Sequence, residues 1–392
     1  MKRFVWYRPL LTRRALLFSL PLLLGASAAP AASPLTLAGV NEAAPDPKAA
    51  ARKGPDPVIV RLQVLLDRAH LSPGTIDGVA GSNVAKALRC FQELRGLKPT
   101  GSLDPQTWKA LTEADPEPAL VEYALTKPDV EGPFTPEIPA RFEDRAKLER
   151  SGYTSPLELL GEKFHMEPRL LQALNPGARF DRAGEKLVVA DVRRHRPRGR
   201  AAALVVDKEA RTLKALAADG SLLAFYPVSI GATVSPAPDG EYRVRAVAEN
   251  PVYYYSPELA FEGVETKKPF QIAPGPNNPV GSVWIALTKD HYGIHGTPDP
   301  SRISKTYSHG CIRMTNWDAE ELARLVRAGI AVRFDAPGAP KSAATRPAKP
   351  APKSTPVEAK AEPAKSDPVP AAEGELILRP VGPEPTQPQR RP

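Results

Sequence analysis

The chain has 392 residues, of which 42% are apolar and 25% charged, so wholesale disorder is excluded and two or three folded domains are expected. Proline contributes 46 residues, about twice its usual share, which predicts extended linkers or tails outside the helices and central strands. The formal net charge of +9 suggests a nucleic-acid partner only if the charge belongs to the folded protein.

Residues 1–28 have the pattern of an export signal. Five basic residues precede an apolar run, 15–25: Lys2, Arg3, Arg8, Arg13 and Arg14. Small residues at Ala26 and Ala28 predict cleavage after Ala28. Because this segment carries more than half of the net charge, its removal leaves little reason to expect a nucleic-acid partner. The adjacent arginines fit both a twin-arginine signal and a general-route signal, so the export route stays open.

The rest of the chain contains no apolar run long enough to span a membrane, and no cysteine lies at the end of the apolar run 15–25 to accept a lipid. We therefore expect a soluble monomer in the periplasm or cell wall. Its two cysteines could pair, but their surroundings favour independent thiols. Cys90 lies in a helical apolar pattern, whereas Cys311 lies in a segment rich in glycine and histidine.

After an Ala/Pro-rich linker at 29–56, residues 57–113 have the periodicity of a small helical bundle. Apolar residues recur at helical spacing in two segments: Leu62, Leu65 and Leu66, then Val84, Leu88, Phe91 and Leu94. Asp104 followed by Pro105 predicts the start of a third helix, which directs Trp108 and Leu111 inward.

The order of turns and helices in this bundle resembles the peptidoglycan-binding three-helix domain of cell-wall enzymes. The motifs that carry it are DGxxG from Asp77, ALxxFQ from Ala87, GxLD from Gly101 and TWxxL from Thr107. Val84 departs from the threonine usual in that family. The resemblance implies binding to peptidoglycan, and the alternative is an inert spacer in which the same residues serve only as core and turns.

Residues 114–152 show no clear periodicity and are predicted to be a linker. Residues 153–190 contain two short helical stretches, then Asn175-Pro-Gly and GxxLVV from Gly184, an order that resembles a LysM-type glycan-binding module. The strand that should open such a module is only weakly indicated by the sequence.

The basic stretch 191–200 could bind an anionic polymer, but a solvated linker is favoured because dense like charges repel one another. Its arginines are Arg193, Arg194, Arg196, Arg198 and Arg200.

From residue 201 the pattern changes to short β-branched segments, which predict a mainly β, sandwich-like domain over 201–335. The predicted strands are 204–207, 213–217, 222–231, 241–248, 283–288 and 331–334. One strong helix is predicted over 317–328, capped by Thr315 or Asn316 and stopped by Gly329. Residues 336–392 are rich in proline, alanine and lysine and are predicted to be disordered.

Three of the six histidines and one of the two cysteines fall within 284–314. A cysteine is an effective nucleophile only as a thiolate, so Cys311 needs a base, and His295 after a strand-like segment is the leading candidate. A hydrogen bond between them would lower the pKa of the thiol. Gly310 just before Cys311 allows the backbone N–H groups near residues 310 and 311 to point at a bound carbonyl oxygen. The chemistry implied is acyl transfer.

The motifs IHGT from Ile294 and SHGCIRM from Ser308 resemble the signature of the YkuD-type L,D-transpeptidase catalytic domain, and the likeness covers about 201–335. It implies that Cys311 is the nucleophile, that His295 is the base and that the Gly296 carbonyl orients the imidazole, with no metal or cofactor. Further residues would shape the substrate pocket: Ser308, His309, Arg313, Tyr292 and Tyr307. Lesser candidates to line the cleft are Tyr253, Tyr254 and Lys305.

In that family the thiolate attacks the carbonyl at the L-centre of diaminopimelate in a donor stem peptide and expels D-Ala. An acceptor amine then resolves the thioester, in a narrow cleft that keeps bulk water away.

Three alternatives remain. The same fold could act as a hydrolase with water as acceptor, or as a noncatalytic wall-binding protein with a structural thiol. A zinc peptidase would use His291, His295, His309 and Cys311 as ligands. Against zinc, the spacing of the first two histidines suits one face of a helix, whereas the residues between them predict strand and turn.

Overall fold

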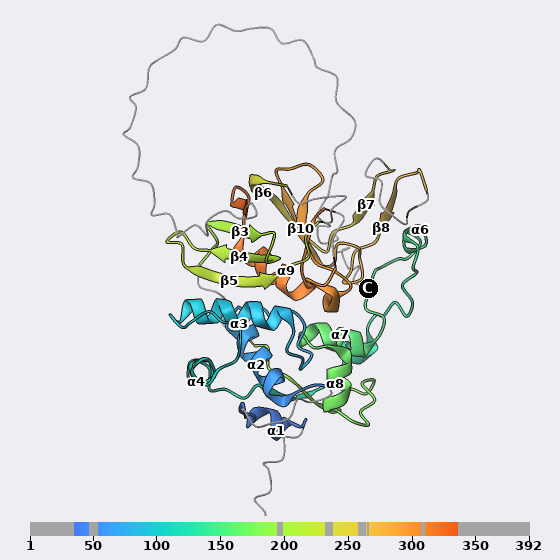
Figure 1. Ribbon diagram of the computed structural model, residues 1–392. Helices are drawn as coiled ribbons and strands as arrows, with labels where there is room; N and C mark the ends of the chain where they lie inside the picture. Colours follow the sequence, from blue (N-terminus) through green and yellow to red (C-terminus); the bar gives the residue numbers. More distant parts are fainter. Residues whose placement is uncertain are drawn as a thin grey trace, which may run out of the picture. The chain divides into compact units, whose positions relative to one another are not determined.

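The computed structural model describes residues 35–46, 54–193, 199–231, 238–257, 264, 266–306 and 310–335 (Figure 1). Several predicted parts lie outside these ranges: the signal 1–28, the tail 336–392, residues 194–198 of the basic stretch and the site candidates Tyr307, Ser308 and His309. Within them, no helix combines the length and the apolar character needed to cross a bilayer.

The helical bundle consists of α2 (Pro57–Arg68), α3 (Ser82–Leu94) and α4 (Pro105–Ala114). Asp104 caps α4 as predicted, because its side chain accepts a hydrogen bond from the N–H of Thr107 at 2.9 Å. The core contains the predicted leucines of α2 together with Val84, Leu88, Phe91 and Leu111.

Leu94, which has the same helical spacing as these residues in the sequence, does not join the core, since it is 52% exposed. A helix turns by about 100° per residue, so Leu94 lies roughly 80° around α3 from Val84, at the margin of the apolar stripe. Trp108 is partly buried against the same core, where the Arg61 guanidinium lies 5.3 Å from its ring centroid.

The stretch 114–152 is more than a linker. It contains β1 (Leu120–Ala124), α5 (Lys127–Glu131) and α6 (Phe142–Arg145). Strand β1 pairs antiparallel with β2 (Lys186–Ala190), and α7 (Pro156–Lys163) and α8 (Pro168–Leu174) lie between them in the chain. We call β1, α7, α8 and β2 the middle unit. The module predicted over 153–190 therefore does have an opening strand. It is β1, which lies earlier in the chain than residue 153 and pairs with β2.

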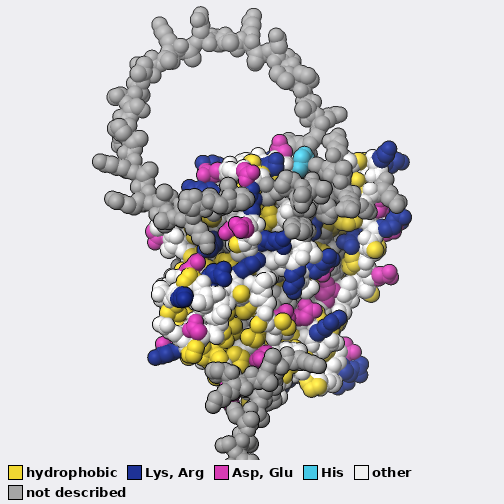
Figure 2. Space-filling model, viewed as in Figure 1, with side chains coloured by type: hydrophobic (Ala, Val, Ile, Leu, Met, Phe, Trp, Pro, Cys, Tyr) yellow, Lys and Arg dark blue, Asp and Glu magenta, His cyan; other side chains and the backbone are white. Residues whose placement is uncertain are grey.

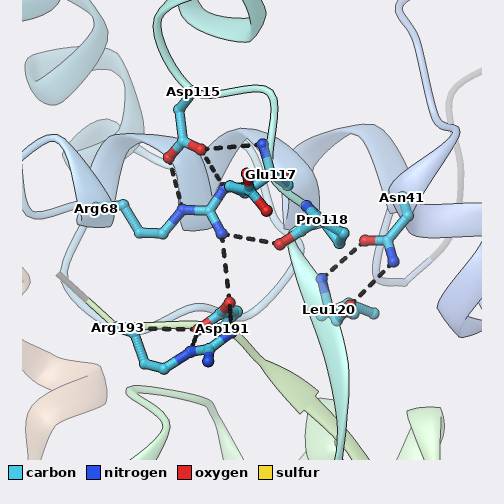
Figure 3. A network of polar contacts seen from close by, with 8 residues as sticks. All are labelled: Asn41, Arg68, Asp115, Glu117, Pro118, Leu120, Asp191 and Arg193. Carbon is cyan, nitrogen blue, oxygen red and sulfur yellow. Dashed lines mark hydrogen bonds and ion pairs between the residues drawn. The ribbon is translucent and has the colours of Figure 1, made fainter.

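The predicted linker 29–56 contains α1 (Leu37–Asn41), which is attached to the middle unit. The Asn41 side chain forms two hydrogen bonds with the backbone of Leu120, at 2.9 and 2.8 Å (Figure 3). Neither α1 nor β1 was predicted, because five-residue elements are too short to establish a periodicity.

Arg68, at the end of α2, joins the bundle to the middle unit (Figure 3). Its guanidinium donates to Asp115 at 2.7 and 2.8 Å and to the carbonyls of Pro118 and Glu117 at 2.8 and 3.0 Å. It also lies 3.8 Å from the carboxylate of Asp191, just after β2. Because the Arg68 side chain is only 6% exposed, these acceptors satisfy a nearly buried charge.

Eight strands form one mixed sheet in the order β11-β10-β9-β6-β12-β3-β4-β5. Their bounds are β3 (Ala203–Asp207), β4 (Thr212–Leu216), β5 (Leu222–Pro227), β6 (Gly240–Glu249), β9 (Val283–Leu287), β10 (Gly293–His295), β11 (Ile312–Arg313) and β12 (Ala331–Asp335). The pairs β10–β11 and β3–β12 are parallel. A separate hairpin is formed by β7 (Tyr253–Tyr255) and β8 (Phe270–Ile272), and a short 3-10 helix covers Pro300–Arg302.

Both ends of this sheet contribute side chains to one core, so the sheet curls over itself in the sandwich-like packing that the sequence predicted. The core is completed by α9 (Asn316–Leu325). This helix ends earlier than predicted, because Val326 adopts an extended conformation and packs into the core on the way to β12. Thr315 provides the cap by accepting from the N–H of Asp318.

The bundle packs directly on the last strand of the sheet, where α3 lies along β5 (Figure 1). Phe225 of β5 is 2% exposed and belongs to the core of the bundle rather than to that of the sheet. Its N–H donates to the carbonyl of His70, and its carbonyl accepts from the N–H of Ser72, both at 2.9 Å. The sheet edge is thereby covered.

The surface carries both signs of charge. Figure 2 shows Lys and Arg side chains interspersed with Asp and Glu over the visible face. Several lie in exposed ion pairs, such as Arg333 with Glu241 at 3.2 Å. The visible face therefore has no extended field of a single sign.

We predict that Phe225→Ala lowers the free energy of unfolding by about 3 to 5 kcal/mol, because it opens a cavity in a core shared by two parts of the chain. Chemical denaturation followed by circular dichroism measures the change. Lys214→Ala, on the neighbouring strand and half-exposed, is the control and should cost less than about 1 kcal/mol. Equal effects of the two substitutions would contradict the shared core.

Candidate active site

The parallel pair β10–β11 brings Cys311 and His295 to the same end of the sheet. Ile294 lies opposite Ile312 and His295 lies opposite Arg313 in the register of the two strands. The two isoleucines are fully buried in the main core. Side chains alternate between the faces of a strand, so His295, Arg313 and Cys311 all point to the other face.

On that face Cys311 belongs to a small apolar cluster with Trp284, Ala286, Val280 and Tyr253. The cysteine is half-buried, and its Sγ lies 3.8 Å from the carbonyl oxygen of His291. Trp284 and Ala286 are alternate residues of β9, Val280 precedes that strand, and Tyr253 belongs to the β7–β8 hairpin. The thiol therefore lies in largely apolar surroundings at the end of the sheet.

The imidazole of His295 is held in one orientation. Its Nδ1 lies 2.7 Å from the carbonyl oxygen of Gly296, and the side chain is 4% exposed. A carbonyl oxygen can only accept, so Nδ1 carries the hydrogen and Nε2 keeps its lone pair as the basic nitrogen. The ring of Trp284 stacks on the imidazole, with centroids 5.5 Å apart and planes at 24°.

Burial favours the neutral form of both the His295 imidazole and the Cys311 thiol. Burial, assisted by Arg313, lowers the pKa of His295 to about 3. Burial also raises the pKa of the Cys311 thiol, although the N–H of Gly293 and the charge of Arg313 act in the opposite direction. Burial thus acts against the lowering of the thiol pKa that a hydrogen bond to His295 would produce.

Gly296, Gly310 and Arg313 lie around this pair. Gly310 is buried with φ of 128°, a conformation that favours glycine directly before Cys311. The backbone of Arg313 forms two hydrogen bonds with Ser229, at 2.8 and 2.9 Å, which fix β11 from its other side. Burial and the nearby thiol act in opposite directions on the pKa of Arg313, and the net effect lowers it.

The other predicted pocket residues differ in their surroundings. Tyr292 is 5% exposed and packs in the main core against Phe334. Burial raises the pKa of its hydroxyl, and the nearby Cys311 thiol acts in the same direction. Lys305 is exposed and borders a small cavity with residues of the bundle, among them Asp77 and Asn83. Tyr253 packs beside Cys311, and Tyr254 is half-buried in β7.

Among the described residues, no group of three or more His, Cys, Asp or Glu side chains could hold a metal ion. His309 lies outside those residues. The Nδ1 of His295 is engaged by Gly296, and His291 is exposed.

Sequence reasoning missed two features of the site. The first is the stacking of Trp284 on the His295 imidazole, which the alternation of residues within W-I-A-L could have indicated. The second is Asn316, considered only as a helix cap. Its buried amide accepts hydrogen bonds from the N–H groups of Thr297 and Ser282, at 3.1 and 3.2 Å.

A buried base with one free nitrogen, on the strand next to a cysteine, is typical of enzymes that form acyl intermediates on sulfur. Residues 201–357 match the family described as "L,D-transpeptidase catalytic domain", and residues 55–111 match "Putative peptidoglycan binding domain". The chain is 31% identical over 178 residues to "Putative L,D-transpeptidase YkuD" of Bacillus licheniformis, covering 45% of this chain and 91% of that protein. The protein of the same name in Bacillus subtilis is 32% identical and covered over 65% of its length.

Similarity to solved structures is partial. An L,D-transpeptidase from Mycobacterium smegmatis is 20% identical, with a TM-score of 0.29, 39% of this chain covered and 64% of that chain. The assignment rests on the relative matched over nine tenths of its length. The chain belongs to the L,D-transpeptidase family, and it is an enzyme of the acyltransferase class.

We predict that the rate of Cys311 alkylation by iodoacetamide keeps rising with pH beyond 9.0, the ordinary value of a thiol, because burial raises the pKa of this group. The raised pKa keeps the thiol protonated at neutral pH, so reactivity is lost as the pH falls. Peptide mass spectrometry separates this site from Cys90, whose pKa burial raises to about 11. A plateau reached near neutral pH would instead indicate a preformed thiolate–imidazolium pair.

Proposed function

We propose that this enzyme is a cysteine-dependent L,D-transpeptidase that acts on peptidoglycan stem peptides through a thioester on Cys311. The observation that carries the proposal is the His295 imidazole, tied at Nδ1 to the Gly296 carbonyl, on the strand paired with that of the cysteine. This arrangement leaves Nε2 as the one nitrogen able to take the thiol proton.

In the proposed acylation step, Nε2 of His295 takes the proton from Sγ while the sulfur attacks the donor carbonyl carbon. The N–H groups of Gly310 and Cys311 hold the oxygen as it gains negative charge. The tetrahedral intermediate expels D-Ala, whose amine receives the proton from His295, and a thioester remains. An acceptor amine then attacks the thioester, and its proton passes through the imidazole to the departing sulfur.

Hydrolysis by the same site is the alternative. The apolar cluster around Cys311 favours the amine, because it leaves few polar groups to hold an attacking water. Incubating the acyl-enzyme with and without an acceptor stem peptide separates the two reactions. Accumulation of a cross-linked product supports transpeptidation, whereas release of free acid at an unchanged rate would establish a hydrolase.

The remaining assignments are part of the same proposal. Residues 55–111 hold the enzyme on peptidoglycan, and the middle unit, with a strand, two helices and a closing strand, binds glycan. Residues 1–28 direct export, so that the enzyme acts in the periplasm or cell wall as a monomer. Fractionation of cells that make a radiolabelled or fluorescent form of the protein tests the location. Recovery of the label in the periplasmic fraction supports the proposal.

We predict that a carbapenem, which mimics the acyl donor, adds one covalent equivalent to the wild-type enzyme and none to Cys311→Ala. Intact-protein mass spectrometry measures the adduct. Cys90→Ala is the matched control and should keep it, since that thiol is 4% exposed in the bundle core. An adduct on Cys311→Ala would reject this nucleophile, and loss of activity to a chelator with the thiol intact would favour a zinc enzyme.

A further inference from the structure

The active site is connected to the middle unit through one buried amide. Asn316, at the start of α9, is fully buried, and its Nδ2 donates to the Glu162 carboxyl at 2.8 and 3.1 Å and to the Pro276 carbonyl at 3.2 Å. Glu162 lies on α7, 154 residues away in the chain. It falls between the two matched family ranges, so neither match accounts for this contact.

The other end of the amide contacts the backbone beside the base. Oδ1 of Asn316 accepts from the N–H of Thr297 at 3.1 Å. A side-chain carbon added at Gly296 would lie only 2.1 Å from this oxygen, so the amide packs tightly against the Gly296 backbone. With two acceptors on one side and two N–H donors on the other, the orientation of the amide is determined.

The N–H of Thr297 and the carbonyl of Gly296 belong to the same planar peptide group. Its carbonyl accepts from Nδ1 of His295 at 2.7 Å, and its N–H donates to Asn316. Rotation of that plane would lengthen both hydrogen bonds together. The amide therefore fixes the direction of the carbonyl that selects the tautomer of the base.

We propose that Glu162 is a positioning residue for catalysis, which holds Asn316 so that the Gly296–Thr297 peptide keeps His295 in its reactive tautomer. The inference rests on the proposed function, because it assigns the orientation of the proposed base to the middle unit. Removal of the Glu162 acceptor leaves the Asn316 Nδ2 with the Pro276 carbonyl alone, so the amide holds the Gly296–Thr297 peptide less firmly.

The surroundings of Glu162 favour its neutral form. Burial raises the pKa of this carboxyl to about 8, with Glu158 on α7 and Glu320 on α9 acting in the same direction. Asn316 and the Tyr153 hydroxyl, 3.4 Å away, oppose the shift. A neutral acid resembles a glutamine, so Glu162→Gln should preserve the contact with Asn316.

We predict that Glu162→Ala lowers kcat by about tenfold to a hundredfold with KM nearly unchanged, because displacing the base slows proton transfer without removing substrate contacts. Glu162→Gln should stay within about threefold of wild type, as expected if a neutral acceptor suffices. Nitrogen-15 NMR of the imidazole gives a readout that a purely structural role would not change. Wild type and Glu162→Gln should show a single tautomer with hydrogen on Nδ1, and Glu162→Ala a mixture.

Asp129→Asn is the matched control. Asp129 is another buried carboxylate near α7. It accepts hydrogen bonds from Lys163, Tyr123 and Thr126, whereas Glu162 accepts from Asn316. This variant should lose thermal stability while keeping kcat and the tautomer. If Glu162→Ala does not fold, Glu162→Met fills the same space without an acceptor and is judged by the same criteria.

A second readout is the pH dependence of stability. A carboxyl whose pKa rises from 4.5 to about 8 on folding contributes stability that is fully present below 4.5 and is lost as the pH rises through 8. The free energy of unfolding of wild type, relative to that of Glu162→Gln, should fall across this interval.

Full kcat and an unchanged tautomer in folded Glu162→Ala or Glu162→Met would overturn the positioning role. That result would leave the proposed function standing as long as Cys311→Ala fails to form the acyl-enzyme. An acylated Cys311→Ala enzyme would instead overturn the proposed function itself, whatever Glu162 does.

Discussion

The hydrogen bond from Nδ1 of His295 to the Gly296 carbonyl is the interaction on which the site depends. This hydrogen bond selects the tautomer, leaves one basic nitrogen and sets the direction of Nδ1. The Trp284 ring stacks on the face of the imidazole and so restrains its tilt. Without it the imidazole would sample both tautomers, and only one presents a lone pair at Nε2. The fold is arranged so that this short contact is supported from several elements.

The two faces of the sheet beside the site pack against different residues, and this packing supports the contact between His295 and Gly296. On one face β9, β10 and β11 contribute residues to the main core, and on the other Trp284 and Ala286 of β9 pack with Cys311. Burial penalises the charged forms of both the thiol and the imidazole. In the mechanism that we propose, the thiolate forms only as His295 takes the proton, when a donor carbonyl arrives.

Much of this was predictable from the sequence, because it depends on local patterns. The strands of the sheet follow β-branched runs, Asp104 and Pro105 mark a helix start, and the motifs around His295 and Cys311 indicate the reactive pair. Features that depend on distant contacts were not predictable. Strand β1 is recognisable only through its partner β2, Tyr292 packs in the main core against Phe334, and the Glu162–Asn316 contact joins residues 154 positions apart. The thiol pKa depends on burial, which no motif encodes.

The most direct test of His295 as the base is the acylation rate of His295→Ala as a function of pH, followed in single turnovers with a carbapenem. At neutral pH this variant should acylate at least about a hundredfold more slowly than wild type, because the proton has no acceptor. The deficit should shrink as the pH rises past 9.0, the ordinary thiol value, where thiolate begins to form unaided. Acylation of His295→Ala at the wild-type rate at neutral pH would contradict the account.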